Sequence, residues 1–184
     1  MQIKDRLRKK FFLRRKKNYF DIKPNFFNPL FKLIEKKYNK KSINLSSYYP
    51  ASFEVNVLNL FEKSMAKKLK TLLPVIADND LMYFYKWKKN DVLQINKFGM
   101  LEPTSFSNHV VPNVMLVPLL AYDDQNNRLG YGKGFYDRYL NKFLKINNNI
   151  LTIGIAFSFQ KYHKLPISNN DVKLNYILTE EGLY

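Results

Sequence analysis

The stretch "NVMLVPLLAYDDQNNRLGYGKGFYDRYLNKFL", Asn113 to Leu144, decides the fold class of this chain. It opens with the near-continuous apolar run "NVMLVPLLAYD", which is typical of a strand buried on both faces. It closes with "FYDRYLNKFL", which has the pattern of a helix. Between them, glycines occupy alternate positions at Gly130, Gly132 and Gly134. A buried strand that leads through such a loop into a helix indicates an α/β protein.

The flanking segments repeat this alternation of strand and helix. "ILTIGIAFS" (150–158) is a second buried strand, and "KLNYILTEEG" (173–182) follows it. Upstream, "SINLSSYYPA" (42–51) predicts a strand that runs into a loop, and "VNVLNLFEKSMAKKL" (55–69) predicts a helix. "KTLLPVIA" (70–77), "DLMYFYKW" (80–87) and "VLQINKFG" (92–99) predict three more strands, the last two joined by the turn-prone "KKND". We therefore expect one domain, residues 1–184, with a largely parallel sheet.

The N-terminal segment is strongly basic. Its first 17 residues carry nine Lys or Arg against one Asp, and Ile3, Leu7 and Phe11 recur at helical spacing. This pattern predicts a basic amphipathic helix. Two prolines in "DIKPNFFNP" end it, and "LFKLIEKKYNKK" (30–41) predicts a second helix.

Composition narrows the class of protein. The chain has 184 residues, is 46% hydrophobic and contains no cysteine, which excludes disulfides and thiolate catalysis. No apolar run approaches the roughly 20 residues that span a bilayer, and the basic start lacks the features of a secretory signal. We expect a cytoplasmic protein without membrane association.

The net charge of +16 has several explanations. It fits a nucleic-acid-binding protein. Lys, Asn, Ile, Phe and Tyr are abundant together, however, which is the set that AT-rich codons favour. A basic surface can also attract a small anionic ligand.

The glycine-rich loop has the chemistry of a phosphate site. Bare backbone lets N–H groups approach an anion at the start of a helix, and Arg128 and Lys133 add positive charge. The spacing fits neither a Walker A loop nor G-x-G-x-x-G. A tight strand-to-helix turn would explain the glycines equally well, and Asp137 could simply be a first-turn acid.

The string "RLGYGKGFYDRYL", preceded by "MLVPLLAYD", resembles the signature of the 5-formyltetrahydrofolate cyclo-ligase family, also called methenyltetrahydrofolate synthetase. Other segments extend the resemblance in the same order. These are Lys4, Leu7 and Arg8 as Lys-x-x-Leu-Arg, then "FEVNV", "MYFYKWKKNDVLQINKFGMLEPT", "GIAFSFQ" and "LPISNNDVKLNYIL". Six segments cover most of the chain.

The resemblance implies a three-layer α/β/α fold and an ATP-dependent ligase. The family uses Mg²⁺ and ATP to convert 5-formyltetrahydrofolate into 5,10-methenyltetrahydrofolate, with release of ADP and phosphate. The formyl oxygen attacks the γ-phosphate, and the second folate nitrogen then closes the ring. The substrate is expected to be 5-formyltetrahydrofolate, polyglutamated or not, bound by a monomer.

The resemblance also implies site residues. Lys133 and Arg128 would be catalytic. The N-terminal helix, residues 1–20, would contribute to the nucleotide site, Asp137 and Asp171 would bind Mg²⁺, and Glu54 would bind the folate together with residues 131–135. The nucleotide would contact Lys4, Arg8, Arg128, Leu129, Gly130, Tyr131, Gly132, Lys133, Gly134, Phe135 and Tyr136.

Several of these residues could instead have an ordinary structural or surface role. Lys4 and Arg8 could be solvated side chains, and Glu54 a surface acid at a helix start. Trp87, Tyr83 and Phe84 could wall the folate site or belong to the core. His109 and His163 match no family position and are expected on the surface.

The chain departs from the family pattern at three positions. Asn126 replaces a glycine in the turn before Arg-Leu-Gly, and because Asn tolerates the left-handed conformation we expect the turn to persist. Val57 stands where a Thr is common, which removes a polar contact. Leu120 replaces a frequent glycine and makes the strand end bulkier.

Two other classes of function compete with the ligase. One is a basic nucleic-acid-binding module, which would leave Asp137 and Asp171 unexplained. The other is a sugar-phosphate-binding α/β relative without ligase activity, which would not need the early Lys-x-x-Leu-Arg segment. The chain has no sequence-specific nucleic-acid motif, so a nucleic-acid partner is not expected.

Overall fold

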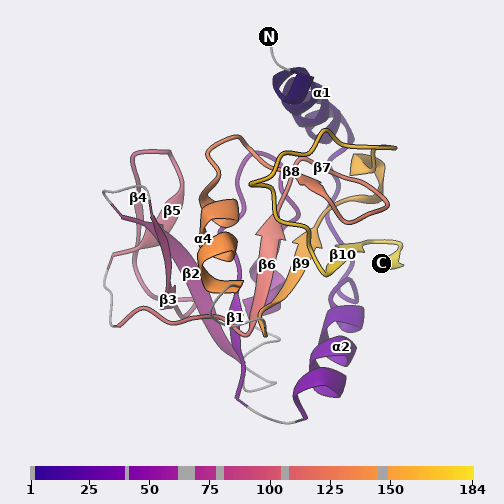
Figure 1. Cartoon of the computed structure of the whole chain (residues 1–184). Coiled ribbons are helices and arrows are strands. Elements are labelled where there is room, and N and C mark those ends of the chain that lie inside the picture. The colour runs from indigo at the N-terminus through magenta and orange to yellow at the C-terminus, as the bar shows by residue number, and fades with distance from the viewer. Residues whose placement is uncertain (1–2, 40–41, 62–68, 78–80, 105–107, 145–148) are drawn as a thin grey trace.

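A computed structural model describes residues 3–39, 42–61, 69–77, 81–104, 108–144 and 149–184. At its centre is a seven-stranded sheet in the order β11–β10–β9–β6–β1–β2–β3 (Figure 1). The strands are β1 (Asn44–Ser46), β2 (Lys70–Ile76), β3 (Met82–Lys86), β6 (Val114–Pro118), β9 (Leu151–Ile155), β10 (Tyr176–Thr179) and β11 (Gly182–Leu183). The five inner strands pair in parallel, and β3 and β11 are antiparallel edges. The predicted largely parallel sheet is confirmed.

The two central strands are buried on both faces. All residues of β9 are buried, and in β6 only the last, Pro118, is partly exposed. Val114 and Leu116 join the hydrophobic core on one side of the sheet, and Met115 and Val117 join the core on the other. This alternation explains why the two strands appear in the sequence as unbroken apolar runs.

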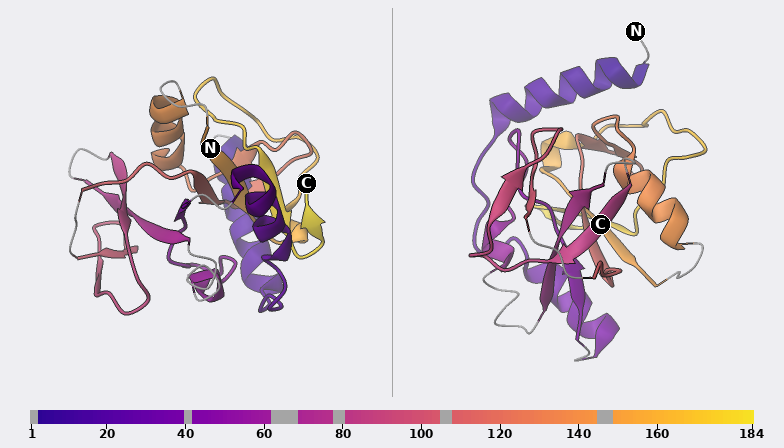
Figure 2. Two further views of the ribbon diagram at one scale, coloured as in Figure 1. Left: turned by 90° about the horizontal axis from the view of Figure 1, so that it is seen from below. Right: turned by 90° about the vertical axis from the view of Figure 1, so that its left-hand side faces the viewer.

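Helices cover both faces of the sheet. Helix α2 (Asn28–Tyr38) buries Leu30, Phe31 and Ile34 against one face. Helix α4 (Phe135–Leu144) buries Tyr139 and Leu140 against the other. The two helices lie on opposite sides of the sheet in the left view of Figure 2, so the layers have the α/β/α order that the resemblance implied.

Helix α1 (Ile3–Asn18) lies across the molecule beyond the carboxyl end of β6, as the right view of Figure 2 shows. Leu7 and Phe11 are buried against Leu120 and Leu129. Ile3, expected on the same buried face, is 67% exposed because the first turn extends past this core. The helix therefore anchors through its middle, and its N-terminal half reaches the edge of the sheet where ligands of α/β folds bind.

Two small antiparallel sheets complete the fold. The pair β7 (Ala121–Tyr122) and β8 (Arg128–Leu129) connects β6 to the glycine loop, and β4 (Leu93–Ile95) and β5 (Leu101–Pro103) form a separate hairpin. A 3₁₀ turn, η1, covers Ser158–Gln160. Of the predicted helix at 55–69, residues 58–61 are helical, residues 55–57 and 69 are not, and residues 62–68 are outside the described residues. In the described part of the chain no helix is long and apolar enough to cross a membrane.

Candidate active site

The glycine loop connects β8 to α4, and two of its glycines are required by the backbone. Gly132 has φ 99° and Gly134 has φ 70°, conformations that side chains disfavour. A Cβ on Gly132 would also lie 3.2 Å from the central carbon of the Arg8 guanidinium. Gly130 does not have a positive φ and has open space where a Cβ would be. The loop is therefore shaped to let helix α1 approach its backbone closely.

Every predicted site residue lines one cavity of about 460 Å³. It lies between the N-terminal half of α1, the loop that follows β1, the glycine loop with the first turn of α4, and the β4–β5 hairpin. The predicted residues at its wall are Lys4, Arg8, Glu54, Arg128, Leu129, Gly130, Tyr131, Gly132, Lys133, Gly134, Phe135, Tyr136, Asp137 and Asp171. Their locations bring together segments from both ends of the chain, while their roles remain predictions.

Arg128 and Asp137 form an ion pair beneath the loop. Arg128 Nη2 donates to Asp137 Oδ1 at 2.7 Å, and Nη1 donates to the Val172 carbonyl oxygen at 2.7 Å. The Val172 N–H donates to the same Asp137 oxygen at 3.0 Å. Only 4% of the Arg128 side chain is exposed. These bonds attach the segment around residue 172 to α4, so Arg128 organises the site as well as charging it.

Lys4 and Arg8 project from one face of α1 into the cavity wall. The Lys4 ammonium pairs with Asp171 Oδ2, which also accepts the Ser168 N–H at 2.7 Å. Burial by itself would raise the pKa of the Asp171 carboxyl, but Lys4 and Ser168 outweigh it, so the pKa is lowered. Arg8 Nε donates to the Gly130 carbonyl oxygen at 3.0 Å. Both cations are thus tied to the site and are not free in solvent.

Glu54 lies in the cavity wall on the turn at residues 51–54, next to Tyr131 of the glycine loop. It accepts the hydroxyl of Tyr131, and its Oε2 accepts the Ala51 N–H at 2.8 Å. Burial raises the pKa of the Glu54 carboxyl, and the bonds to Tyr131 and Ala51 and the charge of Arg15 oppose the shift. A carboxylate held this way in a cavity can accept paired N–H groups of a ligand.

Arg15 is a residue of this region that the sequence analysis missed. It is 1% exposed, and its guanidinium donates to the Tyr131 hydroxyl at 2.7 Å. A signal was present in the sequence, because Arg15 continues the four-residue spacing of Leu7 and Phe11 on the buried face of α1. A cation at a core position of a helix requires polar partners from elsewhere in the fold.

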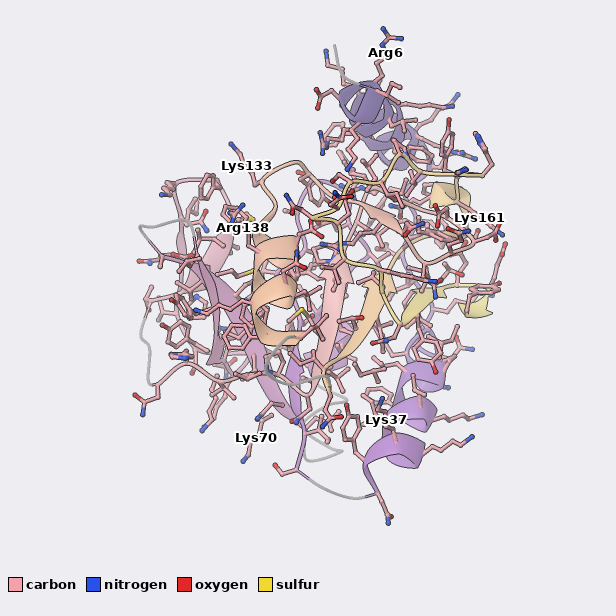
Figure 3. The ribbon with its side chains drawn as sticks, in the orientation of Figure 1. Arg6, Lys37, Lys70, Lys133, Arg138 and Lys161 are labelled. Carbon is pink, nitrogen blue, oxygen red and sulfur yellow. The ribbon has the colours of Figure 1, made fainter. Side chains whose placement is uncertain are left out.

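The β4–β5 hairpin forms a wall that was also missed. Phe98 at its tip lies 5.1 Å from the Phe135 ring, and Lys133 Nζ lies 5.6 Å from the Phe98 ring centre. Buried Glu102 holds the hairpin against β2 by accepting the Ile76 N–H at 3.2 Å. The hairpin contributes residues 96 and 98–101 to the cavity. Figure 3 shows Lys133 projecting from the loop above α4.

Phe84 on β3 and Trp87 directly after it belong to the core and not to the cavity wall. Trp87 packs on Phe61 at 4.9 Å between ring centres, and Phe84 packs on Tyr139 at 5.0 Å. Tyr83 lies 5.2 Å from His109. Of the two readings of these rings, the core reading holds for Trp87 and Phe84, because β3 turns these two side chains toward helices on the two faces of the sheet.

The three departures from the family pattern have structural consequences. Asn126 has φ 60°, so the turn persists as expected, and its Nδ2 also donates to the Asn175 carbonyl oxygen at 3.1 Å. Val57 is fully buried in the core, and Leu120 is buried under α1. His109 and His163 are both exposed, as expected.

The described residues offer no cluster of three or more His, Cys, Asp or Glu side chains that could hold a metal by themselves. Two carboxylates, Asp137 and Asp171, line the cavity near the cationic side chains. The two hydrogen bonds described for Asp137 both end on Oδ1. This donor set suits Mg²⁺, which takes one or two carboxylates and completes its octahedron with water and phosphate oxygens.

The sequence profile of the 5-formyltetrahydrofolate cyclo-ligase family matches residues 1–180. The 5-formyltetrahydrofolate cyclo-ligase of Haemophilus influenzae is 30% identical over 152 residues, 79% of each chain. That of Mycoplasma pneumoniae is 31% identical over 139 residues, 74% of this chain and 73% of the relative.

A solved structure shows the same fold. The NMR structure of Aquifex aeolicus 5,10-methenyltetrahydrofolate synthetase superposes with a TM-score of 0.76 at 27% identity, covering 99% of this chain and 92% of that one. Together with the cavity that gathers the signature residues, these matches establish that the chain belongs to the 5-formyltetrahydrofolate cyclo-ligase family.

Proposed function

We propose that this chain converts 5-formyltetrahydrofolate into 5,10-methenyltetrahydrofolate at the expense of ATP, with Mg²⁺ as the metal. The observation that carries the proposal is a cavity of about 460 Å³ whose wall holds both the phosphate-type loop and the Glu54 carboxylate. A site for two substrates that react with each other needs both binding groups in one enclosure.

The proposed reaction has two bond-making steps. The formyl oxygen attacks the γ-phosphorus of ATP, the bond to the β-phosphate oxygen breaks, and ADP leaves. The second folate nitrogen then attacks the activated formyl carbon and loses its proton, and the carbon–oxygen bond to phosphate breaks. Phosphorylation is needed because the formamide oxygen is a poor leaving group until it carries a phosphoryl group.

The glycine loop supplies the setting for the first step. Phosphoryl transfer depends on positioning and charge neutralisation more than on covalent help. The backbone N–H groups of residues 130–134 and the start of α4 face the nucleotide in this proposal. Lys133 would neutralise the moving phosphoryl group, and Lys4, Arg8 and Arg128 would hold the remaining phosphates.

Glu54 and the apolar walls would hold the folate. The Glu54 carboxylate would accept two N–H groups of the pterin ring. Phe98, Met100 and Ile76 line the cavity with apolar surface that suits a flat ring system. Tyr131, bonded to Glu54, lies where the nucleotide loop and the folate end meet.

Asp137 and Asp171 would hold the Mg²⁺ ion, with phosphate oxygens as further ligands. When bound, the ion would neutralise phosphate charge during transfer. Both carboxylates carry a cationic partner in this structure, Arg128 and Lys4 respectively. For Asp171 the Lys4 partner helps to lower the pKa of the carboxyl, which favours the ionised form that a divalent cation requires.

The competing functions have less support. Figure 3 shows labelled cations pointing outward from separate parts of the molecule, such as Arg6 on α1, Lys37 on α2 and Lys70 on β2. A nucleic-acid footprint would gather charge along one stripe. A sugar-phosphate-binding relative would not need the Glu54 carboxylate in the cavity wall.

The test is a turnover assay with 5-formyltetrahydrofolate and Mg-ATP, followed by the absorbance of the methenyl product. We expect turnover only when ATP is present. Lys133→Ala should lower kcat by about a hundredfold or more, the scale of lost electrostatic stabilisation in transition states. Lys17→Ala, an exposed cation at the end of α1, is the matched control. A flat trace from folded wild-type protein would remove the proposal, and equal effects of the two variants would relocate the phosphate site.

A further inference from the structure

Arg15 is a buried cation that the proposed chemistry does not use. Its side chain extends from the C-terminal half of α1 into the protein, where its exposed fraction is 1%. Nη1 donates to the Leu119 carbonyl oxygen at 3.2 Å and to the Tyr131 hydroxyl at 2.7 Å, and Nη2 donates to the Ser52 carbonyl oxygen at 2.7 Å. A buried guanidinium is costly unless it is bonded, and the buried Nε has no hydrogen-bond partner among the described residues, so the three bonds from the two Nη atoms are what fix its position.

One of these contacts ends on a strained turn. Ser52 has φ 49° and Phe53 has φ 63°, and two consecutive residues other than glycine in the left-handed region are uncommon. Such backbone persists only where the surroundings hold it. The bond from Arg15 to the Ser52 carbonyl is a restraint that comes from outside the turn. Glu54 follows the strained pair directly, so its direction depends on this turn.

A second contact ends on the partner of Glu54. The Tyr131 hydroxyl accepts from Arg15 Nη1 and donates to Glu54 Oε1. The Arg15 guanidinium also lies 5.4 Å from the centre of the Tyr131 ring. Arg15 thus holds Glu54 from two directions, through the backbone of the turn and through the hydroxyl of the loop tyrosine.

We propose that Arg15 is a positioning residue for the folate end of the site, which fixes the Ser52–Phe53 turn and Tyr131 so that the Glu54 carboxylate faces the pterin. This inference rests on the proposed function insofar as it takes Glu54 as the folate contact. It assigns Arg15 chiefly to binding of the folate, because it bonds the turn before Glu54 and the tyrosine that donates to Glu54, and none of its described hydrogen bonds ends on Lys4, Arg8 or Arg128.

Arg15 also supports the ionised form of Glu54. The groups that face Glu54 electrostatically are Arg15 from α1, Tyr131 from the glycine loop, Tyr48 after β1 and Tyr136 from α4. Arg15 is the cation among them. Burial raises the pKa of Glu54 and the Arg15 charge lowers it, so removing that charge should raise the pKa further.

The experiment compares Arg15→Met with Arg14→Met, its exposed neighbour on α1. Calorimetry without ATP measures the Kd for 5-formyltetrahydrofolate, and turnover measures kcat and both KM values. We expect Arg15→Met to raise the folate Kd and KM by about tenfold or more, the scale of a misplaced positioning contact. The KM for ATP should stay within about twofold, and Arg14→Met should resemble the wild type.

The pH profile adds a readout that a purely structural role would not move. Folate binding should be lost on acidification as Glu54 protonates. In Arg15→Met the acid limb of kcat/KM for folate should move to higher pH, because the charge that opposes the rise in the Glu54 pKa is gone. In Arg15→Lys the charge remains but the fork is lost, so the folate Kd should weaken several-fold while the acid limb stays in place.

The possible results separate the proposed role of Arg15 from its alternatives. An unchanged folate Kd in folded Arg15→Met, or equal rises in both KM values, would overturn the inference. If Arg15→Met does not fold, an unchanged folate Kd in Arg15→Lys would overturn it. A wild type that binds folate without turnover would refute the proposed ligase, while a weakened Kd in the variants would still support the role of Arg15. A wild type that does not bind folate would overturn both.

Discussion

The glycine loop at residues 130–134 and the turn at residues 51–54 face the same cavity but hold their backbones by different means. The loop has glycines at the two positions where φ is 99° and 70°, so its own sequence permits its conformation. The turn places Ser52 and Phe53 at positive φ, and it is held by hydrogen bonds between Ala51 and Glu54 and by a distant arginine on α1. The comparison teaches that a site can combine backbone encoded by glycines with backbone that also needs a restraint from outside.

Replacing Gly132 by alanine should disrupt the conformation of the glycine loop, the part of the site whose backbone is encoded locally. An alanine at φ 99° costs about 1–3 kcal/mol of strain, and its Cβ would press on the Arg8 guanidinium. We expect kcat/KM to fall by about a hundredfold, the effect of a displacement near 1 Å in a positioned site. Gly130→Ala is the control in the same loop, because it has open space and no positive φ. Equal losses in the two variants would show that the loop shape is not the cause.

Replacing Asp137 by asparagine tests whether this carboxylate beneath the loop binds Mg²⁺. The variant keeps an oxygen that can accept from Arg128 and from the Val172 N–H, but it removes the negative charge. The Mg²⁺ concentration for half-maximal turnover should rise by at least roughly tenfold, the scale of changes at metal sites. Asp124→Asn, on an exposed acid paired with Lys161, is the control. An unchanged requirement would leave Asp137 as the partner of Arg128 only.

Replacing Ser52 by glycine tests the turn at residues 51–54, and it should have the smallest effect of the three replacements on stability and on the folate KM. Glycine adopts the φ of 49° without strain, and the Ser52 carbonyl that accepts from Arg15 is retained. We expect the free energy of unfolding to change by less than about 1 kcal/mol, because relief of strain and added freedom of the unfolded chain oppose each other. The folate KM should stay within about twofold, as steady-state kinetics would show. A large rise in KM would mean that the serine side chain matters.

Much of the nucleotide end was predictable from the sequence, because its signals are local. The apolar run at 113–123 predicted the buried strand, the glycines predicted a bare loop, and the charged residues around them predicted a phosphate site. Even the change to Asn126 was readable, since asparagine tolerates the left-handed φ of 60° that the structure shows. The roles of Lys4 and Asp171 were implied by family resemblance and not by spacing.

The folate end was harder to predict from the sequence, because the local pattern around each of its residues indicates a different role. Arg15 looks like one more cation in a basic helix, and Ser52 and Phe53 carry no turn signature. In the β4–β5 hairpin only the segment 92–99 was predicted as a strand and β5 was not, while the aromatic residues considered for the wall, Trp87 and Phe84, pack into the core. Whether these rings belong to the core or to the cavity wall depends on which face of the strand packs against which helix. The sequence of the strand alone does not determine that packing.

The sequence by itself determined the alternation of strands and helices, the family and the bare loop, because periodicity and glycine act within a few residues of themselves. Only the tertiary structure decided that Lys4 meets Asp171, that Arg15 supports the turn before Glu54, and that a hairpin closes the cavity. Those contacts join residues far apart in the chain. The two from α1 exist because Leu7 and Phe11 pack the helix across the carboxyl edge of the sheet, and the hairpin is held against β2 by Glu102.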